Sequence, residues 1–207
     1  MEPEVIGTFL HRHLSPPSRP LVASMDASGR CEQYTSIARC RVGGRFVQAR
    51  MRQTGAVVGF EGSGHYYLSR WGPSSDGILV ACVLADLLMR ARVTLSSLVG
   101  DFGSIFRANG AIEFISRTMA AQTYAAIRET LGGRTFEPAL EGTEVRLAAG
   151  RVLFRLSNTQ PAIRITLEAS KRPGLADLQR FLKEVLQAIE MEGGAFSLYG
   201  SKKESQN

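Results

Sequence analysis

The sequence predicts an α/β protein in which a layered α/β/α domain is followed by a smaller α+β domain. In the first half of the 207 residues, short apolar stretches alternate with segments of helical spacing, a pattern typical of layered α/β folds. In the second half, a hairpin pattern and a cleanly alternating strand lie between two helical segments. A four-stranded antiparallel sheet with two helices on one face accommodates these elements economically. We place the boundary near residues 100–109 and expect domains over residues 1–103 and 104–207.

Apolar spacing and turn residues predict the elements of the first domain. Residues 5–14 and 44–54 have helical spacing, and the second helix is expected to end near Gly55. The predicted short strands are LVASM, AVVGF and HYYLSRW, in that order along the chain.

The longest apolar run, ILVACVLADLLM, covers residues 78–89. It is too short to span a bilayer and it contains Asp86, so we expect a buried helix. Asp76 stands where an N-cap is needed, just before this helix.

The second domain reads as strand, helix, hairpin, strand and helix. The strand AIEFIS is followed by the helix AAQTYAAIRETLGG, which a glycine pair closes. TEVRLAAGRVLFRL is typical of a hairpin with Gly150 near the turn. In IRITLEA, one face carries Ile163, Ile165 and Leu167, and the other carries Arg164, Thr166 and Glu168. The last helix follows Pro173 and places its leucines on one side.

Composition narrows the class of protein. Hydrophobic residues make up 44% of the chain and charged residues 21%, which is typical of a soluble globular protein. The net charge of +6 favours anionic partners, but the basic residues are scattered, so we expect neither nucleic acid nor membrane as a partner. Three cysteines without a CxxC motif, and acids where an export signal needs bases, indicate reduced thiols in a cytoplasmic protein. Cys82, inside the apolar run, is expected to be buried.

The segment RLSNTQPAIR, between two predicted strands, is the first candidate binding loop. Arg155 and Arg164 stand at its ends, and Ser157, Asn158 and Thr159 supply hydroxyl, amide and backbone donors between them. Arginines that flank a turn of successive N–H groups form a good site for a tetrahedral oxyanion such as phosphate. An ordinary polar hairpin loop with two surface arginines is the competing interpretation.

The segment GFEGSGHYYL is the second candidate. Its glycines let the backbone approach a ligand closely, and Glu61, Ser63 and His65 stand between them. A carboxylate, a hydroxyl and an imidazole on such a turn suit the vicinal hydroxyls of a sugar. A glycine-rich hairpin with a surface histidine is the competing interpretation. His11 and His13 are two apart on a predicted helix, so they do not share a face, and we expect both at the surface.

With these loops in order, the chain resembles the C-terminal half of the α-D-phosphohexomutases. GFEGSGH resembles the family's sugar-recognition loop, and SSDGILVACVLADLL resembles the helix that follows it. RLSNTQPAIR resembles the phosphate loop of the final domain. Its Ser-Asn-Thr core is similar to the phosphomannomutase/phosphoglucomutase branch, with the phosphoglucosamine mutases more distant. In RVGGRFVQARMRQTGAVVGF, Arg41 takes the place of a basic residue that faces the family's active cleft.

The resemblance implies both a fold and a division of labour. The two domains would be the family's third and fourth, the fourth having the shape of the TATA-binding protein, with a hinge near residues 100–109. Sugar would be bound by Glu61, Ser63, His65 and Arg41, and phosphate by Arg155, Ser157, Asn158, Thr159 and Arg164. The substrate would be a hexose phosphate or bisphosphate.

The resemblance also implies groups that these residues do not supply. The family's first domain carries a phosphoryl-bearing serine, and its second carries an Asp-Gly-Asp type loop that binds Mg²⁺. Neither motif occurs here, so we expect no catalytic residue and no metal ligand in this chain, and no turnover by it alone.

Three functions are open at this stage. The favoured one is the phosphosugar-binding half of a phosphohexomutase, with the serine and Mg²⁺ supplied by a separate chain or by upstream sequence. The alternative is a non-catalytic phosphosugar-binding or regulatory module. A basic nucleic-acid-binding protein comes last, because no motif supports it.

Overall fold

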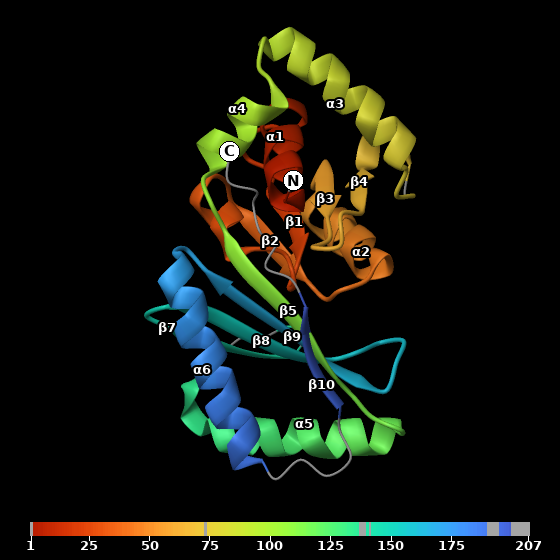
Figure 1. Ribbon diagram of the computed structural model, residues 1–207. Helices are drawn as coiled ribbons and strands as arrows, with labels where there is room; N and C mark the ends of the chain where they lie inside the picture. The colour runs from red at the N-terminus through yellow and green to blue at the C-terminus, as the bar shows by residue number, and fades with distance from the viewer. Residues whose placement is uncertain (1, 73, 137–139, 141, 190–194, 200–207) are drawn as a thin grey trace. The chain divides into compact units, whose positions relative to one another are not determined.

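The computed structural model describes residues 2–72, 74–136, 140, 142–189 and 195–199 (Figure 1). The chain divides into two compact units, Met1–Ser104 and Ile105–Asn207, which we call the first and the second unit. Of the stretch expected to link the domains, residues 100–102 are helical and residues 106–109 are in a strand. Within the described residues, no helix is both long enough and apolar enough to cross a membrane.

The first unit alternates helices and strands. Its elements are α1 (Pro3–Leu14), β1 (Leu21–Ser24), β2 (Ile37–Cys40), α2 (Gly44–Thr54), β3 (Val58–Phe60), β4 (Tyr66–Leu68), α3 (Gly77–Ala91) and α4 (Leu95–Phe102), with short 3-10 helices at Gly29–Gln33 and Ser69–Trp71. The strand β2 and the helix α4 were not predicted, and the predicted strand over residues 65–71 is shorter because its last three residues form a 3-10 helix.

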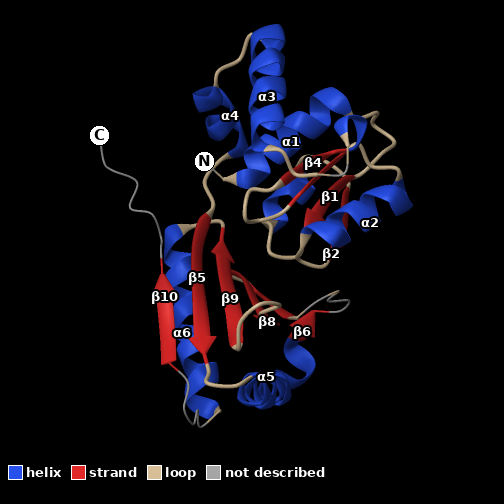
Figure 2. Cartoon of the chain, turned by 90° about the vertical axis from the view of Figure 1, so that its right-hand side faces the viewer, coloured by secondary structure: helices blue, strands red, loops and turns tan. Residues whose placement is uncertain are grey.

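Three parallel strands and one antiparallel strand form the sheet of the first unit, in the order β2-β1-β3-β4. Successive side chains of β3 point to opposite faces. A Cβ added at Gly59 would meet Val47 and Met51 of α2, whereas the ring of Phe60 lies against Gly7 of α1. The helices α1 and α2 therefore cover opposite faces, and the predicted α/β/α layering is confirmed (Figure 2).

The helix α3 departs from expectation because it is largely exposed. Only Val80 and Leu87 among its residues are buried, and the side chains of Ile78 and Met89 are 81% and 73% exposed. Cys82 is exposed too, so the predictions of a buried helix and of a buried Cys82 are wrong. The predicted cap is confirmed, since the carboxylate of Asp76 accepts the Leu79 backbone N–H at 3.0 Å. An apolar composition allows a helix to be buried, but it does not show whether another segment packs against it.

The prediction of a surface position is also wrong for His11, although His13 is exposed. His11 is only 5% exposed in α1, and its Nδ1 has no hydrogen-bond partner among the described residues. Burial lowers the pKa of His11, because desolvation disfavours the charged imidazolium.

The second unit is built on one antiparallel sheet. Its elements are β5 (Phe106–Glu113), α5 (Arg117–Leu131), β6 (Thr135–Phe136), β7 (Thr143–Leu147), β8 (Gly150–Leu156), β9 (Ala162–Ala169), α6 (Arg172–Ala188) and β10 (Ala195–Tyr199), with a 3-10 helix at Gly132–Arg134. The strand order is β10-β5-β9-β8-β7-β6, so β6 and β10 are edge strands beyond the four that were expected. The first strand begins earlier than predicted and ends before Phe114.

Both helices of the second unit pack on one face of this sheet, as predicted. The core joins Ile112, Phe154 and Ile165 of the sheet with Ile127 of α5 and Leu178 of α6. Each of these side chains is fully buried. In β8 and β9 alternate residues face this core, so the residues between them face the other side of the sheet.

Candidate functional site

The parallel strands of the first unit end at one edge of the sheet. β1, β2 and β3 run in the same direction and end at Ser24, Cys40 and Phe60. Arg41 and Glu61 follow β2 and β3 directly, so both lie at this edge. The carboxyl ends of parallel strands are the usual place for ligands in open α/β sheets. The sequence-predicted sugar loop is therefore where such a fold places a binding site.

Glu61 is held by the protein on both of its carboxylate oxygens. The backbone N–H of Gly43 donates to Oε1 at 2.9 Å, and the Tyr67 hydroxyl donates to Oε2 at 2.8 Å. The side chain is 6% exposed. Burial raises the pKa of the Tyr67 hydroxyl, and its hydrogen bond to Glu61 raises it further. Glu61 thus joins the loop to β4 and to the start of α2.

Two glycines are required by close approaches around this carboxylate. A Cβ at Gly44 would lie 2.4 Å from the Tyr67 hydroxyl oxygen. A Cβ at Gly62 would lie 2.8 Å from the backbone oxygen of Asp26. These two glycines therefore allow the start of α2 to approach Tyr67 and the loop to approach the segment after β1.

Ser63 and His65 form the exposed part of the loop. The Ser63 hydroxyl and the Nδ1 of His65 are 2.9 Å apart. A turn holds the loop, because the N–H of Gly64 donates to the Glu61 carbonyl at 2.9 Å and Gly64 has a φ of 88°. Both side chains are exposed to solvent and neither contacts a charged group in the described residues, so both are open to a ligand.

Arg41 is exposed and lies over an aromatic ring at the same edge. Its guanidinium carbon is 4.5 Å from the centroid of Phe46, and that of Arg45 is also 4.5 Å away. Cation–π contacts of this kind restrain the position of a guanidinium. Arg45 was not predicted as a site residue; its spacing from Arg41 on either side of a glycine pair was the available signal.

A second unpredicted arginine fixes the neighbouring loop. Arg39 of β2 donates to the carbonyl oxygens of Ser24 and Ala27 at 3.0 Å and of Ser28 at 2.9 Å. It also pairs with Glu32 at 2.9 Å. The chain after β1 is therefore tied to β2 beside the candidate site.

In the second unit, the phosphate loop predicted from the sequence connects β8 and β9. Ser157 is 8% exposed; its N–H donates to the Ala162 carbonyl at 2.8 Å and its hydroxyl accepts the Gln160 N–H at 3.3 Å. Asn158 and Thr159 lie at the exposed tip. Ser157 therefore shapes the loop, while the tip remains accessible.

The two arginines at the ends of this loop are direct cross-strand partners. Arg155 of β8 pairs with Arg164 of β9 in the ladder, and both lie on the face opposite the helices because Phe154 and Ile163 belong to the core. The guanidinium of Arg164 donates to the side-chain oxygen of Gln160. The side chain of Arg155 is half-buried and makes no hydrogen bond or ion pair in the described part of the chain.

The same face of the sheet shows how the protein neutralises arginines elsewhere. Arg146 and Arg151 are also cross-strand partners, but Glu144 contacts them at 2.7 and 3.2 Å. Glu168 contacts Arg151 at 3.1 Å and Arg107 at 3.2 Å. Burial lowers the pKa of Arg151, but the two carboxylates outweigh it and raise the pKa. No described carboxylate neutralises Arg155 in this way.

Arg117 is a further cation at the predicted phosphate loop, and the sequence did not single it out. It is the first residue of α5, and its guanidinium donates to the Asn158 carbonyl at 3.4 Å. The neighbouring Phe114 N–H donates to the Pro161 carbonyl at 2.9 Å. The signal that the sequence offered for Arg117 was its position at the start of a helix that follows a predicted strand.

In the part of the chain that the structure describes, potential metal ligands do not converge. Over the residues described, no three His, Cys, Asp or Glu side chains come together in a way that could hold a metal ion. Mg²⁺ is bound in proteins through carboxylates and waters, so the described residues do not fit it.

Two family models match the chain. The model for the α/β/α domain III of phosphoglucomutase/phosphomannomutase matches residues 5–104. The model for the C-terminal domain of phosphoglucomutase/phosphomannomutase matches residues 116–185.

Curated relatives are similar over most of the chain but over only part of their own length. A phosphoglucosamine mutase from a Nostoc species is 32% identical over 143 residues, which cover 67% of this chain and 27% of that protein. The phosphoglucosamine mutase of Syntrophomonas wolfei is 30% identical, and the match covers 74% of this chain and 32% of that protein. The sequence favoured the phosphomannomutase/phosphoglucomutase branch of the family, whereas these two relatives are phosphoglucosamine mutases. The assignment to a branch therefore stays a prediction.

Solved structures share the fold. A phosphoglucomutase/phosphomannomutase family protein from Burkholderia thailandensis matches with a TM-score of 0.75 at 21% identity, over 93% of this chain and 43% of that one. An Aspergillus fumigatus N-acetylphosphoglucosamine mutase, solved in complex with GlcNAc-6P and magnesium, matches with a TM-score of 0.61 at 13% identity, over 90% of this chain and 43% of that one.

Proposed function

Since this chain belongs to the phosphoglucomutase/phosphomannomutase family, we propose that it is the phosphosugar-binding half of a phosphohexomutase. The complete enzyme would interconvert hexose 1-phosphate and hexose 6-phosphate. The loop of the first unit would bind the sugar hydroxyls, and the loop of the second unit would bind the phosphate that is not being transferred.

Arg155, which no described carboxylate neutralises, carries this proposal. Arg155 and Arg164 are directly opposite each other in the ladder, and like charges at that spacing repel. Glu144 relieves the equivalent repulsion between Arg146 and Arg151. At Arg155 a bound phosphate would do the same, with the hydroxyl of Thr159 and the amide of Asn158 completing its coordination. Arg164, its cross-strand partner, would add a second positive charge beside the phosphate.

The sugar end would be bound by the exposed part of the first loop. Ser63 and His65 would exchange hydrogen bonds with vicinal hydroxyls, and Arg41 would face the negatively charged substrate from the end of β2. Glu61 has both oxygens engaged, but each carboxylate oxygen can accept more than one hydrogen bond. Its contact with the sugar would therefore add to its role in shaping the loop.

The described residues bind and orient but do not supply the transfer chemistry. In-line phosphoryl transfer needs a nucleophile, and Mg²⁺ would neutralise charge that develops on the phosphoryl oxygens. We infer that both come from residues outside this sequence, and no step at the metal is assigned to this chain. Its own contribution would be to hold the sugar hydroxyls and the resting phosphate so that the reacting oxygen is in line.

Calorimetric titration with glucose 1-phosphate and mannose 1-phosphate tests the phosphate site. A charge-assisted hydrogen bond is worth about 1.5–3 kcal/mol, so Arg155→Ala should raise Kd by about 10- to 100-fold. Arg128→Ala is the matched control, because Arg128 is an exposed arginine in the last turn of α5, at the end far from the loop. Equal binding by the two variants would refute the assignment.

Mixing the chain with the serine- and Mg²⁺-bearing half of a family member separates an enzyme half from a binding module. Conversion of glucose 1-phosphate to glucose 6-phosphate in the mixture supports the enzyme half. Binding of hexose phosphate without conversion by any such mixture would favour the regulatory module.

A further inference from the structure

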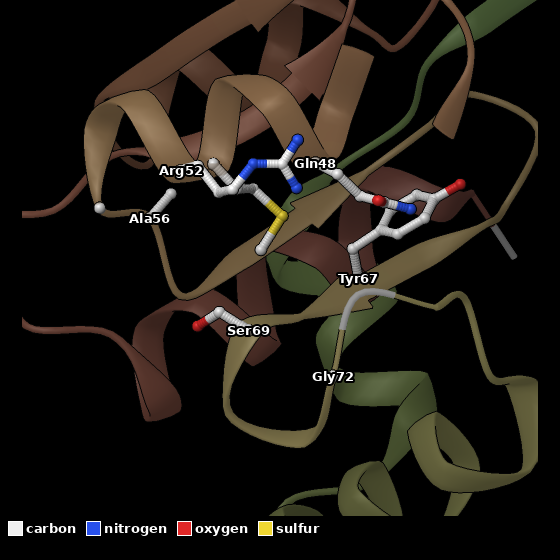
Figure 3. A pocket seen from close by; sticks show the side chains of 8 residues that line it. Gln48, Arg52, Ala56, Tyr67, Ser69 and Gly72 are labelled. Atoms are coloured by element: carbon white, nitrogen blue, oxygen red, sulfur yellow. The ribbon is translucent and has the colours of Figure 1, made fainter. Parts of the chain in front are cut away.

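A cavity in the first unit lies away from the carboxyl edge of the parallel strands, beside the C-terminal half of α2. It has a volume of about 360 Å³ and is open to solvent. Its walls come from α2, from the start of the segment leading into β3, and from β4 and the residues after it (Figure 3). The lining residues are Gln48, Met51, Arg52, Gly55, Ala56, Tyr67, Ser69 and Gly72.

The floor of the cavity is apolar and the rim is polar. Met51, Ala56 and Tyr67 are buried beneath it, with exposed fractions of 6%, 3% and 5%. The side chains of Arg52 and Ser69 make no hydrogen bond or ion pair in the described part of the chain. Apolar walls with a few convergent polar groups are the usual composition of small-molecule sites. The volume is also in the range of such sites.

The positive charge at the rim of the cavity favours a negatively charged ligand. None of the lining residues is acidic, and Arg52 brings one cation. Arg19 is not a lining residue, but it packs against Gly55, where its Nη1 donates to the Thr54 carbonyl at 3.3 Å. Arg52 over an apolar floor fits an anionic group attached to an apolar body.

Tyr67 connects this cavity to the sugar loop. Its ring lines the cavity, and its hydroxyl donates to Glu61 at 2.8 Å. Gly44, at the start of α2, lies against the same hydroxyl. A ligand that presses on the ring therefore acts on the group that holds Glu61 in place.

We propose that the cavity between α2 and β4 is a second binding site, for a small anion with an apolar body, and that Tyr67 transmits its occupancy to the sugar loop. The binding site stands on the cavity and its charge alone. The regulatory part rests on the proposed function, because it assumes that residues 61–65 bind the sugar. A ligand at this site would thereby modulate hexose phosphate affinity from a distance.

The test uses 2-naphthoate as the probe. Acetate, which carries the negative charge but lacks the apolar body, and 2-naphthol, which has the apolar body but no carboxylate, serve as comparisons. Binding to the full chain is followed by NMR at the methyl group of Met51 and at the backbone amides of Ser63–His65. The expected result is a saturable shift of the Met51 methyl with 2-naphthoate, at a Kd of about 1 mM or tighter, and binding at least tenfold weaker for the other two probes. No shift of the Met51 methyl by 2-naphthoate at 10 mM, a concentration about tenfold above that Kd, would overturn the proposal.

Two variants test separately whether the cavity binds the anion and whether Tyr67 transmits that binding to the sugar loop. Arg52→Gln should weaken 2-naphthoate at least tenfold, whereas Arg12→Gln, an exposed arginine of α1, should leave it unchanged. Equal affinity in both variants refutes the charge assignment. Tyr67→Phe should keep the Met51 shift but abolish the shift of the loop amides, with thermal unfolding measured alongside to confirm the fold.

Loop shifts that persist in Tyr67→Phe refute the transmission through Tyr67. These readouts do not depend on sugar binding. Failure of the hexose phosphate titration would therefore leave the cavity proposal standing, and failure at Met51 would leave the phosphate site standing.

Discussion

Neutralising Glu144 should destabilise the second unit far more than neutralising an exposed acid of the same unit. Glu144 is 2% exposed and is the carboxylate that separates Arg146 from Arg151. In Glu144→Gln, the two arginines face each other in the ladder and Arg151 keeps its ion pair with Glu168. Breaking a buried pair by removing one partner costs about 3–5 kcal/mol, and the residual contact with Glu168 places our expectation near 3 kcal/mol.

Urea denaturation followed by circular dichroism measures this difference in free energy of unfolding. The control is Asp177→Asn, which removes a salt bridge of 3.3 Å between side chains that are 70% and 53% exposed. Exposed pairs of this type contribute at most about 1 kcal/mol. If Glu144→Gln costs no more than Asp177→Asn, the reasoning about the buried network is wrong.

A double variant sharpens the same test. Glu144→Leu and Arg151→Met each leave buried charges behind, but together they remove both members of one pair. The double variant should therefore cost less than the sum of the two single variants, because contacting residues are not additive.

Two further predictions concern the first unit. Because burial lowers the pKa of His11, the unfolded state binds more protons than the folded state as the pH falls below 6.5, so stability should decrease from there toward pH 5, and His11→Leu should flatten that dependence in thermal unfolding. In the native protein, iodoacetamide at pH 8 should modify the exposed Cys82 and spare the buried Cys31 and Cys40, as peptide mapping would show, since burial raises the pKa of Cys40 to about 12. A pH-independent difference between His11→Leu and the parent chain, or rapid modification of Cys40, would contradict these expectations.

Local patterns predicted the elements whose signals lie within a few residues. The helix over residues 44–54 has the bounds expected, because its apolar spacing ends at Gly55, which adopts the left-handed conformation with a φ of 65°. The alternation in β8 and β9 likewise placed Arg155 and Arg164 on the face opposite the core, and the ladder makes them direct partners.

The errors arise where burial depends on distant segments. β2 was missed because IARC is short and contains Arg39, whose guanidinium is bound by carbonyl groups of another loop. His11 is an ordinary helix residue in the sequence, and only packing within the unit reveals that it is buried. The same limit applies to Glu61, since no local pattern shows that Gly43 and Tyr67 occupy its oxygens.

The double anchoring of Glu61 affects how ligand preference in this loop can change. A substitution at Glu61 disturbs the attachment of β4 and the beginning of α2. A loss of ligand affinity in such a variant could therefore come from a changed loop structure as well as from a lost ligand contact. The side chains of Ser63 and His65 contact one another at the exposed tip, outside that anchor. Under the proposed function, substitutions at these two positions would therefore alter which pattern of sugar hydroxyls is bound, while the scaffold beneath them stays intact.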